Sequence, residues 1–175
     1  SAPRSAAAPA SPQGLGGDLG NWQVSFGYQY NRLKLGTGTV STHGLNMSLV
    51  RYLAGPLGLE ANLGTGFHGN TGTNTVPNGL GFHNLFFGGG AHVSFSRESR
   101  IEPWVHALVG VEHYRFTQTA KLGTLNSVAW TLGGGADFHL NSVTAIRVQA
   151  DYLGTRFGST GQKNFQLVTG LVINF

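Results

Sequence analysis

The chain has 175 residues. Only 10% of them are charged, whereas soluble domains usually have roughly 25%. The mean hydropathy is −0.05, and no apolar run approaches the roughly 18 residues of a membrane helix. These values exclude an ordinary soluble domain and a helical membrane protein. They fit a transmembrane β-barrel, in which lipid-facing and interior residues alternate and the average hydropathy cancels.

The first 20 residues are rich in Ala, Pro, Ser and Gly and contain little to bury. We predict an N-terminal extension over residues 1–20 and one folded unit over residues 21–175. The simpler interpretation of the extension is a flexible or extended tail. The alternative is a strip that binds a periplasmic or membrane protein, because an extended Pro-rich segment loses little entropy on docking.

Eight segments after residue 20 alternate with the period of two that is typical of β-strands. The first four cover residues 21–33, 43–53, 57–68 and 83–96. Polar residues and glycine occupy the face opposite the apolar one, and Arg51 interrupts the apolar face of the second segment. The apolar faces consist of Trp22, Val24, Phe26, Tyr28 and Tyr30; Leu45, Met47, Leu49 and Leu53; Leu57, Leu59, Ala61, Leu63 and Phe67; and Leu85, Phe87, Ala91, Val93 and Phe95.

The last four segments cover residues 102–116, 127–140, 144–154 and 167–175. Trp104 is the exception among the aromatic residues near the short-turn ends, because its parity places it on the polar face. The apolar faces consist of Val105, Ala107, Val109 and Val111; Val128, Trp130, Leu132, Ala136 and Phe138; Ile146, Val148, Ala150 and Tyr152; and Leu167, Thr169, Leu171, Ile173 and Phe175.

Short and long connections alternate between these segments. The short ones lie near residues 54–56, 97–100 and 141–144, and the long ones cover roughly residues 33–42, 69–82, 117–126 and 156–163. This sorting is typical of an outer-membrane barrel. The bilayer core cannot satisfy a free sheet edge, so we expect residues 165–175 to pair with residues 22–32. The predicted fold is all-β, a closed eight-stranded antiparallel up-and-down transmembrane barrel with short periplasmic turns and longer extracellular loops.

Three stretches carry a family resemblance: VTGLVINF (168–175), IEPWVHALVGVEHYRF (101–116) and AWTLGGGADFHLNSVTAIRVQADYLG (129–154). They resemble the end, the fifth strand and the sixth and seventh strands of eight-stranded outer-membrane barrels of the OmpA transmembrane-domain and OmpX type. The resemblance implies the outer membrane of a Gram-negative-type bacterium as the location. It also implies that the assembly machinery reads a terminal signal formed by Leu171, Ile173 and Phe175.

Ionisable residues on the predicted inner face form a candidate network. If Phe138 faces Ile146 across the short turn, Asp137 and Arg147 become direct neighbours. An eight-stranded barrel has room for side chains rather than for an aqueous channel, and a buried charge needs a partner. We interpret the set as a structural plug, with a gated ion or proton path as the alternative. It comprises Asp137, Arg147, Asp151, Glu60 and Glu102, with His92, His106 and His139 as possible partners.

Positive charges gather at the predicted long-loop ends, where Glu112 is the accompanying acid. We predict a basic outer rim that contacts lipopolysaccharide phosphates or another polyanion, with ordinary solvated charge as the alternative. Its members are Arg32, Lys34, Arg115, Lys121, Arg156 and Lys163. Aromatic residues near both ends are predicted to anchor the barrel at the membrane interfaces: Trp22, Tyr28, Tyr30, Phe95, Phe138, Tyr152 and Phe175.

Neither a metal site nor a catalytic site is predicted. His43, His68, His83 and His113 lie near long-loop strand ends, without the spacing of a ligand motif. The lipid A deacylases of the outer membrane resemble this fold as well, and they use His and Ser near the outer rim. In this sequence, His139 and Ser142 lie at a short turn instead. Their sequence positions differ by an odd number, so their side chains are expected on opposite faces of the sheet. We expect no cofactor, no enzymatic activity and no nucleic-acid partner.

We therefore predict a small integral outer-membrane barrel with a filled interior and a structural or interaction role. That role would be membrane integrity, loop display or anchoring of a partner protein, with outer-membrane lipids and lipopolysaccharide as contacts. The alternative is transport of a small molecule through the barrel or a lateral opening. A lipid-modifying enzyme is a third possibility.

Overall fold

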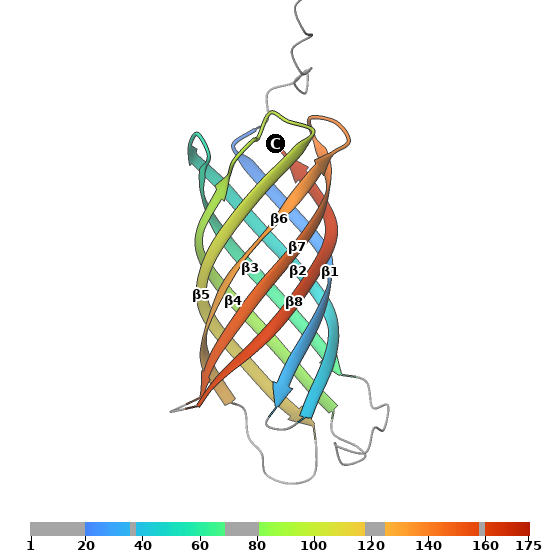
Figure 1. Cartoon of the computed structure of the whole chain (residues 1–175), viewed down its shortest axis with the longest axis vertical. Helices are drawn as coiled ribbons and strands as arrows, with labels where there is room; N and C mark the ends of the chain where they lie inside the picture. The colour runs from blue at the N-terminus through green and yellow to red at the C-terminus, as the bar shows by residue number, and fades with distance from the viewer. Residues whose placement is uncertain (1–19, 36–37, 69–80, 118–124, 158–159) are drawn as a thin grey trace, which may run out of the picture.

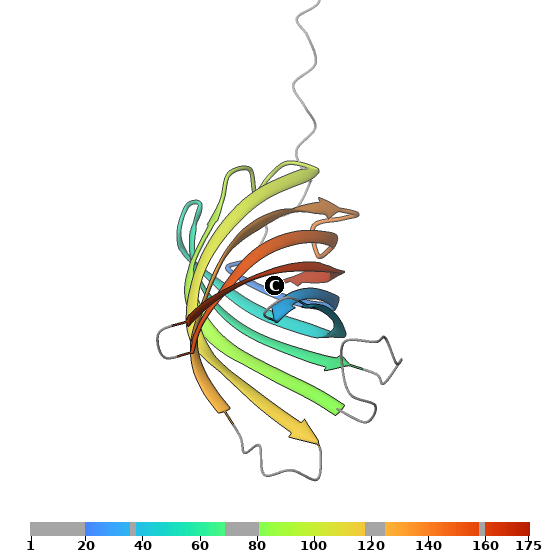
Figure 2. The same cartoon turned by 60° about the horizontal axis from the view of Figure 1, so that its bottom comes forward.

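The computed structural model of the chain (Figure 1) describes residues 20–35, 38–68, 81–117, 125–157 and 160–175. Within these ranges, no helix is long and apolar enough to cross a membrane. The strands run obliquely around a barrel (Figure 2). They are β1 (Trp22–Leu35), β2 (Gly38–Ala54), β3 (Leu57–His68), β4 (Gly81–Ser94), β5 (Ile101–Thr117), β6 (Leu125–His139), β7 (Thr144–Phe157) and β8 (Thr160–Asn174).

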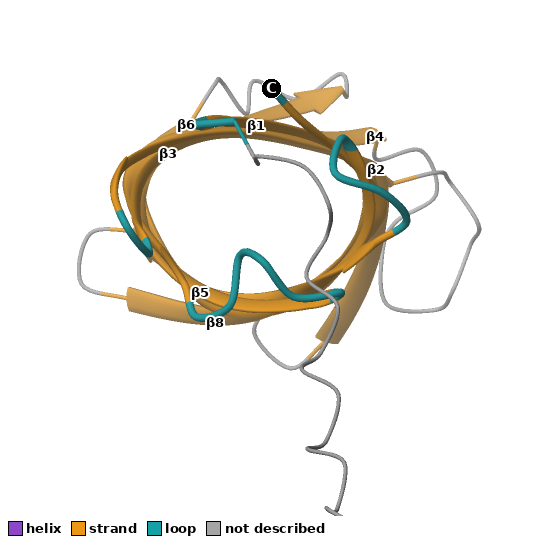
Figure 3. Ribbon diagram, turned by 90° about the horizontal axis from the view of Figure 1, so that it is seen from above, coloured by secondary structure: helices purple, strands orange, loops and turns teal. Residues whose placement is uncertain are grey.

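The sheet closes on itself, because each strand pairs antiparallel with the next and β8 pairs with β1. Seen from above, the strands form a ring (Figure 3). The register of the closing pair runs from Gln23 opposite Asn174 to Arg32 opposite Phe165. At its end, the amides of Trp22 and Phe175 each donate to the other residue's carbonyl oxygen, at 3.0 Å. The predicted pairing of the chain end with the first strand is present.

Side chains alternate between an inside that is mostly polar and an outside that is mostly apolar. On β1, Gln23 and Gln29 are 1% and 2% exposed, whereas Phe26 and Tyr28 are 47% and 49% exposed. This reverses the arrangement of a soluble protein, whose apolar side chains turn inward. A barrel presents this outside to hydrocarbon, and its hydrogen-bonded backbone leaves no polar group there unsatisfied. Arg51 is exposed as its parity predicts, with its guanidinium 5.1 Å from the centre of the Trp22 ring.

The strands at the long-loop end are longer than the predicted segments. The ladder between β1 and β2 continues to Leu35 opposite Gly38, where residues 33–42 were expected to form a connection. The ladder between β7 and β8 continues to Phe157 opposite Thr160. Both residues lie within the connection that was expected over residues 156–163. Backbone pairing persists there although the Gly-, Thr- and Ser-rich sequence has lost its apolar alternation. Residues 69–80 and 118–124 lie outside the described ranges.

The opposite, short-turn end carries the tight connections and the end of the chain (Figure 1). Between β2 and β3, Gly55 has a φ of 52°, a left-handed conformation that glycine adopts without steric cost. Between β6 and β7, the Asn141 side-chain oxygen accepts hydrogen bonds from the amides of Val143 and Thr144, at 2.9 and 2.7 Å. These turns fix the register of the strands that carry the buried charges.

Val109 tests the lipid-facing assignment, because it is 65% exposed near the middle of β5. The Val109→Arg variant should lose about 2–4 kcal/mol of unfolding free energy in phospholipid vesicles, as expected for a cation near the bilayer midplane. Val143→Arg in the short turn should lose only about 0–1 kcal/mol. Urea unfolding measures both losses, and equal losses would contradict the assignment.

Candidate functional site

Ionisable side chains buried inside the barrel form the candidate site. Among the described residues, the buried acids are Glu60, Glu102, Glu112, Asp137 and Asp151, and the one buried arginine is Arg147. Three buried histidines, His92, His106 and His139, accompany them. Carboxyl groups therefore outnumber guanidinium groups by five to one, so the interior requires further cations or protons to approach neutrality.

Asp137 and Arg147 are opposite each other on β6 and β7, as their spacing across the short turn predicts. Arg147 Nε donates to Asp137 Oδ1 at 2.8 Å, and Nη2 donates to Oδ2 at 2.7 Å. Both side chains are almost inaccessible to solvent. The bidentate geometry satisfies both carboxylate oxygens and holds the guanidinium in one orientation.

Arg147 also reaches across the interior to the strands on the other side of the seam. Its Nη2 donates to Gln23 Oε1 on β1 at 2.7 Å. Its Nη1 lies 3.3 Å from Ser25 Oγ on β1 and 3.2 Å from Ser48 Oγ on β2. The guanidinium carbon is 4.5 Å from the centre of the Trp104 ring. One side chain thus joins β7 to β1, β2, β5 and β6.

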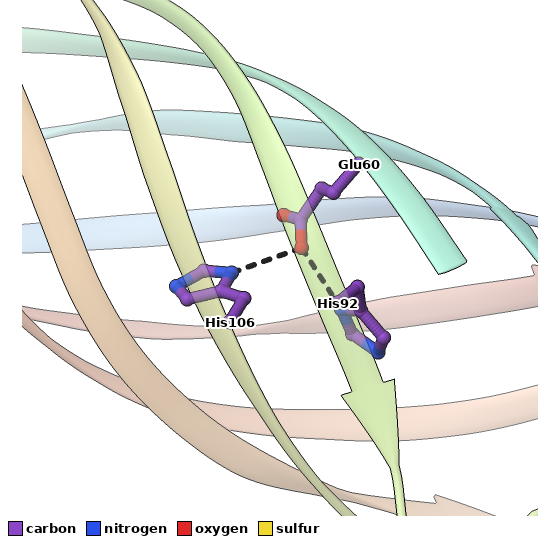
Figure 4. A group of neighbouring side chains, drawn as sticks. All are labelled: Glu60, His92 and His106. Carbon is purple, nitrogen blue, oxygen red and sulfur yellow. Dashed lines mark hydrogen bonds and ion pairs between the residues drawn. The ribbon is translucent and has the colours of Figure 1, made fainter. Parts of the chain in front are cut away.

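A second cluster around Glu60 joins β3, β4 and β5 (Figure 4), and Asp151 connects it to β7. Glu60 Oε2 lies 2.9 Å from Nδ1 of His92 and 2.9 Å from Nδ1 of His106. The other nitrogen of His106, Nε2, lies 3.1 Å from Asp151 Oδ1. Asn62 donates to Glu60 Oε1 at 3.3 Å. His106 is therefore held between two carboxyl groups.

A third cluster surrounds Glu102 near the short-turn end. Ser94 Oγ donates to Glu102 Oε1 at 2.5 Å, and Tyr52 donates to the same oxygen at 3.2 Å. His139 Nε2 lies 2.7 Å from Glu102 Oε2. The carboxylate stands between the serine and the histidine, whereas a hydrolytic triad needs the histidine between the serine and the acid. Ser94 therefore donates its hydrogen bond to the Glu102 carboxylate and not to a histidine.

Arg97, in the turn after β4, closes the short-turn end. Its Nη2 donates to the carbonyl oxygen of Gly20 at 2.7 Å, and its guanidinium carbon lies 3.6 Å from the centre of the Tyr52 ring. Tyr52 in turn donates to Glu102. A chain of contacts therefore runs from the start of the described chain to the third cluster.

Glycines on the inner face of β6 make room for the large interior side chains. A Cβ added at Gly133 would overlap Asp151 Oδ1, so the missing side chain allows Asp151 to reach His106. A Cβ at Gly135 would lie 2.9 Å from Trp104 Cζ2. The Gly-Gly-Gly run of β6 thus shapes the space that the clusters occupy.

Two of the predicted rim residues and six of the predicted anchors are exposed at the barrel surface. Arg32 and Arg115 are exposed near the long-loop end. Lys121 lies outside the described residues, and so do the side chains of Lys34, Arg156 and Lys163. Tyr30 is half-buried and bonds Ser41 Oγ at 2.9 Å. The exposed anchors are Trp22, Tyr28, Phe95, Phe138, Tyr152 and Phe175, and Leu171 and Ile173 of the predicted assembly signal also face outward.

Trp104 is the interior residue whose role sequence reasoning missed. Its indole Nε1 donates to Asp137 Oδ1 at 3.0 Å. Its ring stacks on His92, with the ring centres 4.9 Å apart, and meets His106 edge-on at 5.2 Å. Trp104 therefore connects the Asp137 and Glu60 clusters. The signal was its inward parity, which distinguishes it from the outward-facing Trp22 and Trp130.

No protein-family model matches the chain, and no curated protein matches it. Several solved structures do match. Neisserial surface protein A has a TM-score of 0.73 at 12% identity, over 91% of this chain and 100% of that chain. Ail, the attachment invasion locus protein of Yersinia pestis, has a TM-score of 0.64 at 14% identity, over 90% and 100%.

The N-terminal β-barrel domain of Pseudomonas aeruginosa OprF has a TM-score of 0.55 at 15% identity, again over 90% and 100% of the two chains. This chain has the fold of the eight-stranded outer-membrane β-barrels. The expected likeness to the OmpA and OmpX type is confirmed at the level of fold. The architecture also indicates the predicted location, the outer membrane of a Gram-negative-type bacterium.

A double-mutant cycle tests the Asp137–Arg147 pair of this outer-membrane barrel. Asp137→Leu and Arg147→Met should each lower the unfolding free energy by about 3–5 kcal/mol, since each leaves a buried charge without its partner. The double variant should lose clearly less than the sum, because no charge remains unpaired. Urea unfolding in phospholipid vesicles gives the values, with Arg51→Met as an exposed-arginine control. Strictly additive losses would contradict the pairing.

Proposed function

We propose that this protein is a non-catalytic outer-membrane barrel whose interior side chains obstruct passage and brace the wall. Its role would then be structural and interactive: supporting membrane integrity, displaying loops or anchoring a partner. The observation that carries this proposal is Arg147, which spans the interior from β7 to the serines of β1 and β2. A solute moving along the barrel axis would have to break these bonds and the Asp137 pair.

Two further features support an obstructed interior. Glu102 and Asp137 are direct cross-strand neighbours on β5 and β6, and Trp104 joins Asp137 to His92 of the Glu60 cluster. Arg97 and Tyr52 stack at the short-turn end. An eight-stranded barrel is just wide enough for its own side chains, so these residues leave little width for a permeant ion.

Transport through the barrel or a lateral opening is the less supported alternative. A route for an apolar molecule needs a continuous apolar lining. The buried apolar cluster among the described residues comprises Phe86, Ala129 and Leu153. The other buried apolar side chains share the interior with carboxyl, imidazole and amide groups. Lipid hydrolysis has weaker support still, because Glu102 separates Ser94 from His139.

Planar-bilayer recording tests the obstruction. The wild-type chain should give no stable conductance above the bare membrane. The double variant Trp104→Ala with Arg147→Ala removes the two largest fully buried side chains. It should show open events, provided circular dichroism confirms its strand content. A long-lived ohmic conductance of the wild-type chain would contradict the proposal.

The exposed arginines near the long-loop end support contact with anionic lipid. Arg32 and Arg115 can bind phosphate or sulfate through charged hydrogen bonds. Ail has been solved in complex with the heparin analogue sucrose octasulfate. We propose that Arg32 and Arg115 bind anionic groups in a similar way, and that lipopolysaccharide phosphates are the anion in the membrane.

Charge reversal tests the rim. Arg32→Glu with Arg115→Glu should weaken binding of lipopolysaccharide and of sucrose octasulfate about tenfold or more, and added salt should weaken wild-type binding. Isothermal titration in detergent measures the affinities. Arg100→Glu is the matched control, because this exposed arginine lies in a turn at the opposite end. Equal weakening by the control would contradict a rim site.

Two predicted partners remain proposals. Residues 1–19 of the proposed protein-binding strip lie outside the described ranges, and its last residue, Gly20, is held by Arg97. The assembly machinery is proposed to read the outward-facing Leu171, Ile173 and Phe175.

A further inference from the structure

We infer that Glu60, His92 and His106 form a binding site for a first-row transition-metal dication such as Zn²⁺. One carboxylate oxygen and two imidazole nitrogens, all buried, lie within 4.8 Å of one another. Two histidines and one glutamate are a recurrent zinc ligand set, with a fourth position left for water. Imidazole ligands favour such ions over Mg²⁺ or Ca²⁺, which prefer oxygen.

The geometry requires only a small adjustment. Glu60 Oε2 lies 2.9 Å from each Nδ1 atom. Tetrahedral ligands at about 2.0–2.1 Å from an ion are separated by about 3.3 Å. The two oxygen–nitrogen distances are therefore about 0.4 Å shorter than this spacing, and the two imidazole nitrogens lie within 4.8 Å of each other. The three residues come from β3, β4 and β5, and His92 and His106 are directly opposite each other.

The groups around the site would hold the ligands in place. His106 turns its other nitrogen, Nε2, toward Asp151 Oδ1 at 3.1 Å. A carboxylate behind the histidine is the usual support of a metal-bound imidazole. Gln149 and Gln166 donate to the other Asp151 oxygen at 2.6 and 3.2 Å. Trp104 packs against both imidazole rings.

The charge of the cluster accommodates a dication. Arg147 is committed to Asp137, which leaves Glu60 and Asp151 with the two histidines. A dication bound by Glu60 and two neutral histidines, with the Asp151 carboxylate behind His106, gives a net charge of zero.

The first test measures zinc retained by the chain after refolding into detergent micelles with excess Zn²⁺ and desalting. The wild-type chain should retain about one zinc per chain, the stoichiometry of a single site. His92→Gln and His106→Gln should bind zinc about tenfold more weakly or worse, and Asp151→Asn about 10–100-fold more weakly. His139→Gln is the matched control, because this buried histidine bonds Glu102 instead, and it should retain zinc.

Two results would overturn the site. One is a wild-type chain that retains no zinc, which means that protons alone satisfy the cluster. The other is equal zinc in wild type and His92→Gln/His106→Gln, which places the metal elsewhere. If the variants fail to fold, X-ray absorption on the zinc-loaded wild-type chain decides. Two imidazole nitrogens at about 2.0–2.1 Å support the site, and a spectrum without imidazole ligands refutes it.

Discussion

The contact between an apolar outer face and hydrocarbon is the constraint on which the rest of this structure depends. Hydrocarbon cannot hydrogen-bond, so the sheet must close and the charged side chains of the membrane-spanning strands favour the interior. The β1–β8 pairing closes the sheet. Among the described residues, five carboxyl groups and one guanidinium are buried in the narrow interior, and they form the buried clusters.

Those clusters are held together by residues from many strands. Arg147 joins both sides of the seam, and Trp104 connects the arginine's carboxylate partner to the histidines beside Glu60. Networks of this kind are costly when half satisfied and rigidifying when complete. The inner-face glycines of β6 belong to the same arrangement, because Gly133 admits Asp151 to His106. The identity of an inner-face residue on one strand therefore depends on the inner-face residues of other strands.

Much of this architecture could be predicted from sequence, for a physical reason. Alternate side chains of a β-strand point to opposite faces of the sheet, so the sequence alone indicates which of them face lipid. Phe26 and Gln29 could therefore be assigned to opposite faces without a structure. Asp137 and Arg147 could be paired because a short turn fixes the register between them. The alternation fades beyond the apolar belt, so the continuation of β1 to Leu35 and of β2 from Gly38 gave no signal.

The contacts across the interior could not be predicted in the same way. Glu60, His92 and His106 lie on three strands, and their meeting depends on two registers and on the tilt of the barrel. No spacing in the chain encodes it. The reach of Arg147 to Ser25 and Ser48 likewise depends on closure, which brings β7 beside strands far away in sequence.

Lipid contact at the outer face can be measured directly. The chain has no cysteine, so single cysteines at Phe87, Val109, Trp130 and Leu171 can each carry one spin label in phospholipid vesicles. The account predicts that dissolved oxygen relaxes these labels strongly and a water-soluble nickel complex does not, with the opposite result at Arg100 in the short turn. Strong relaxation by the nickel complex at the four belt positions would contradict it.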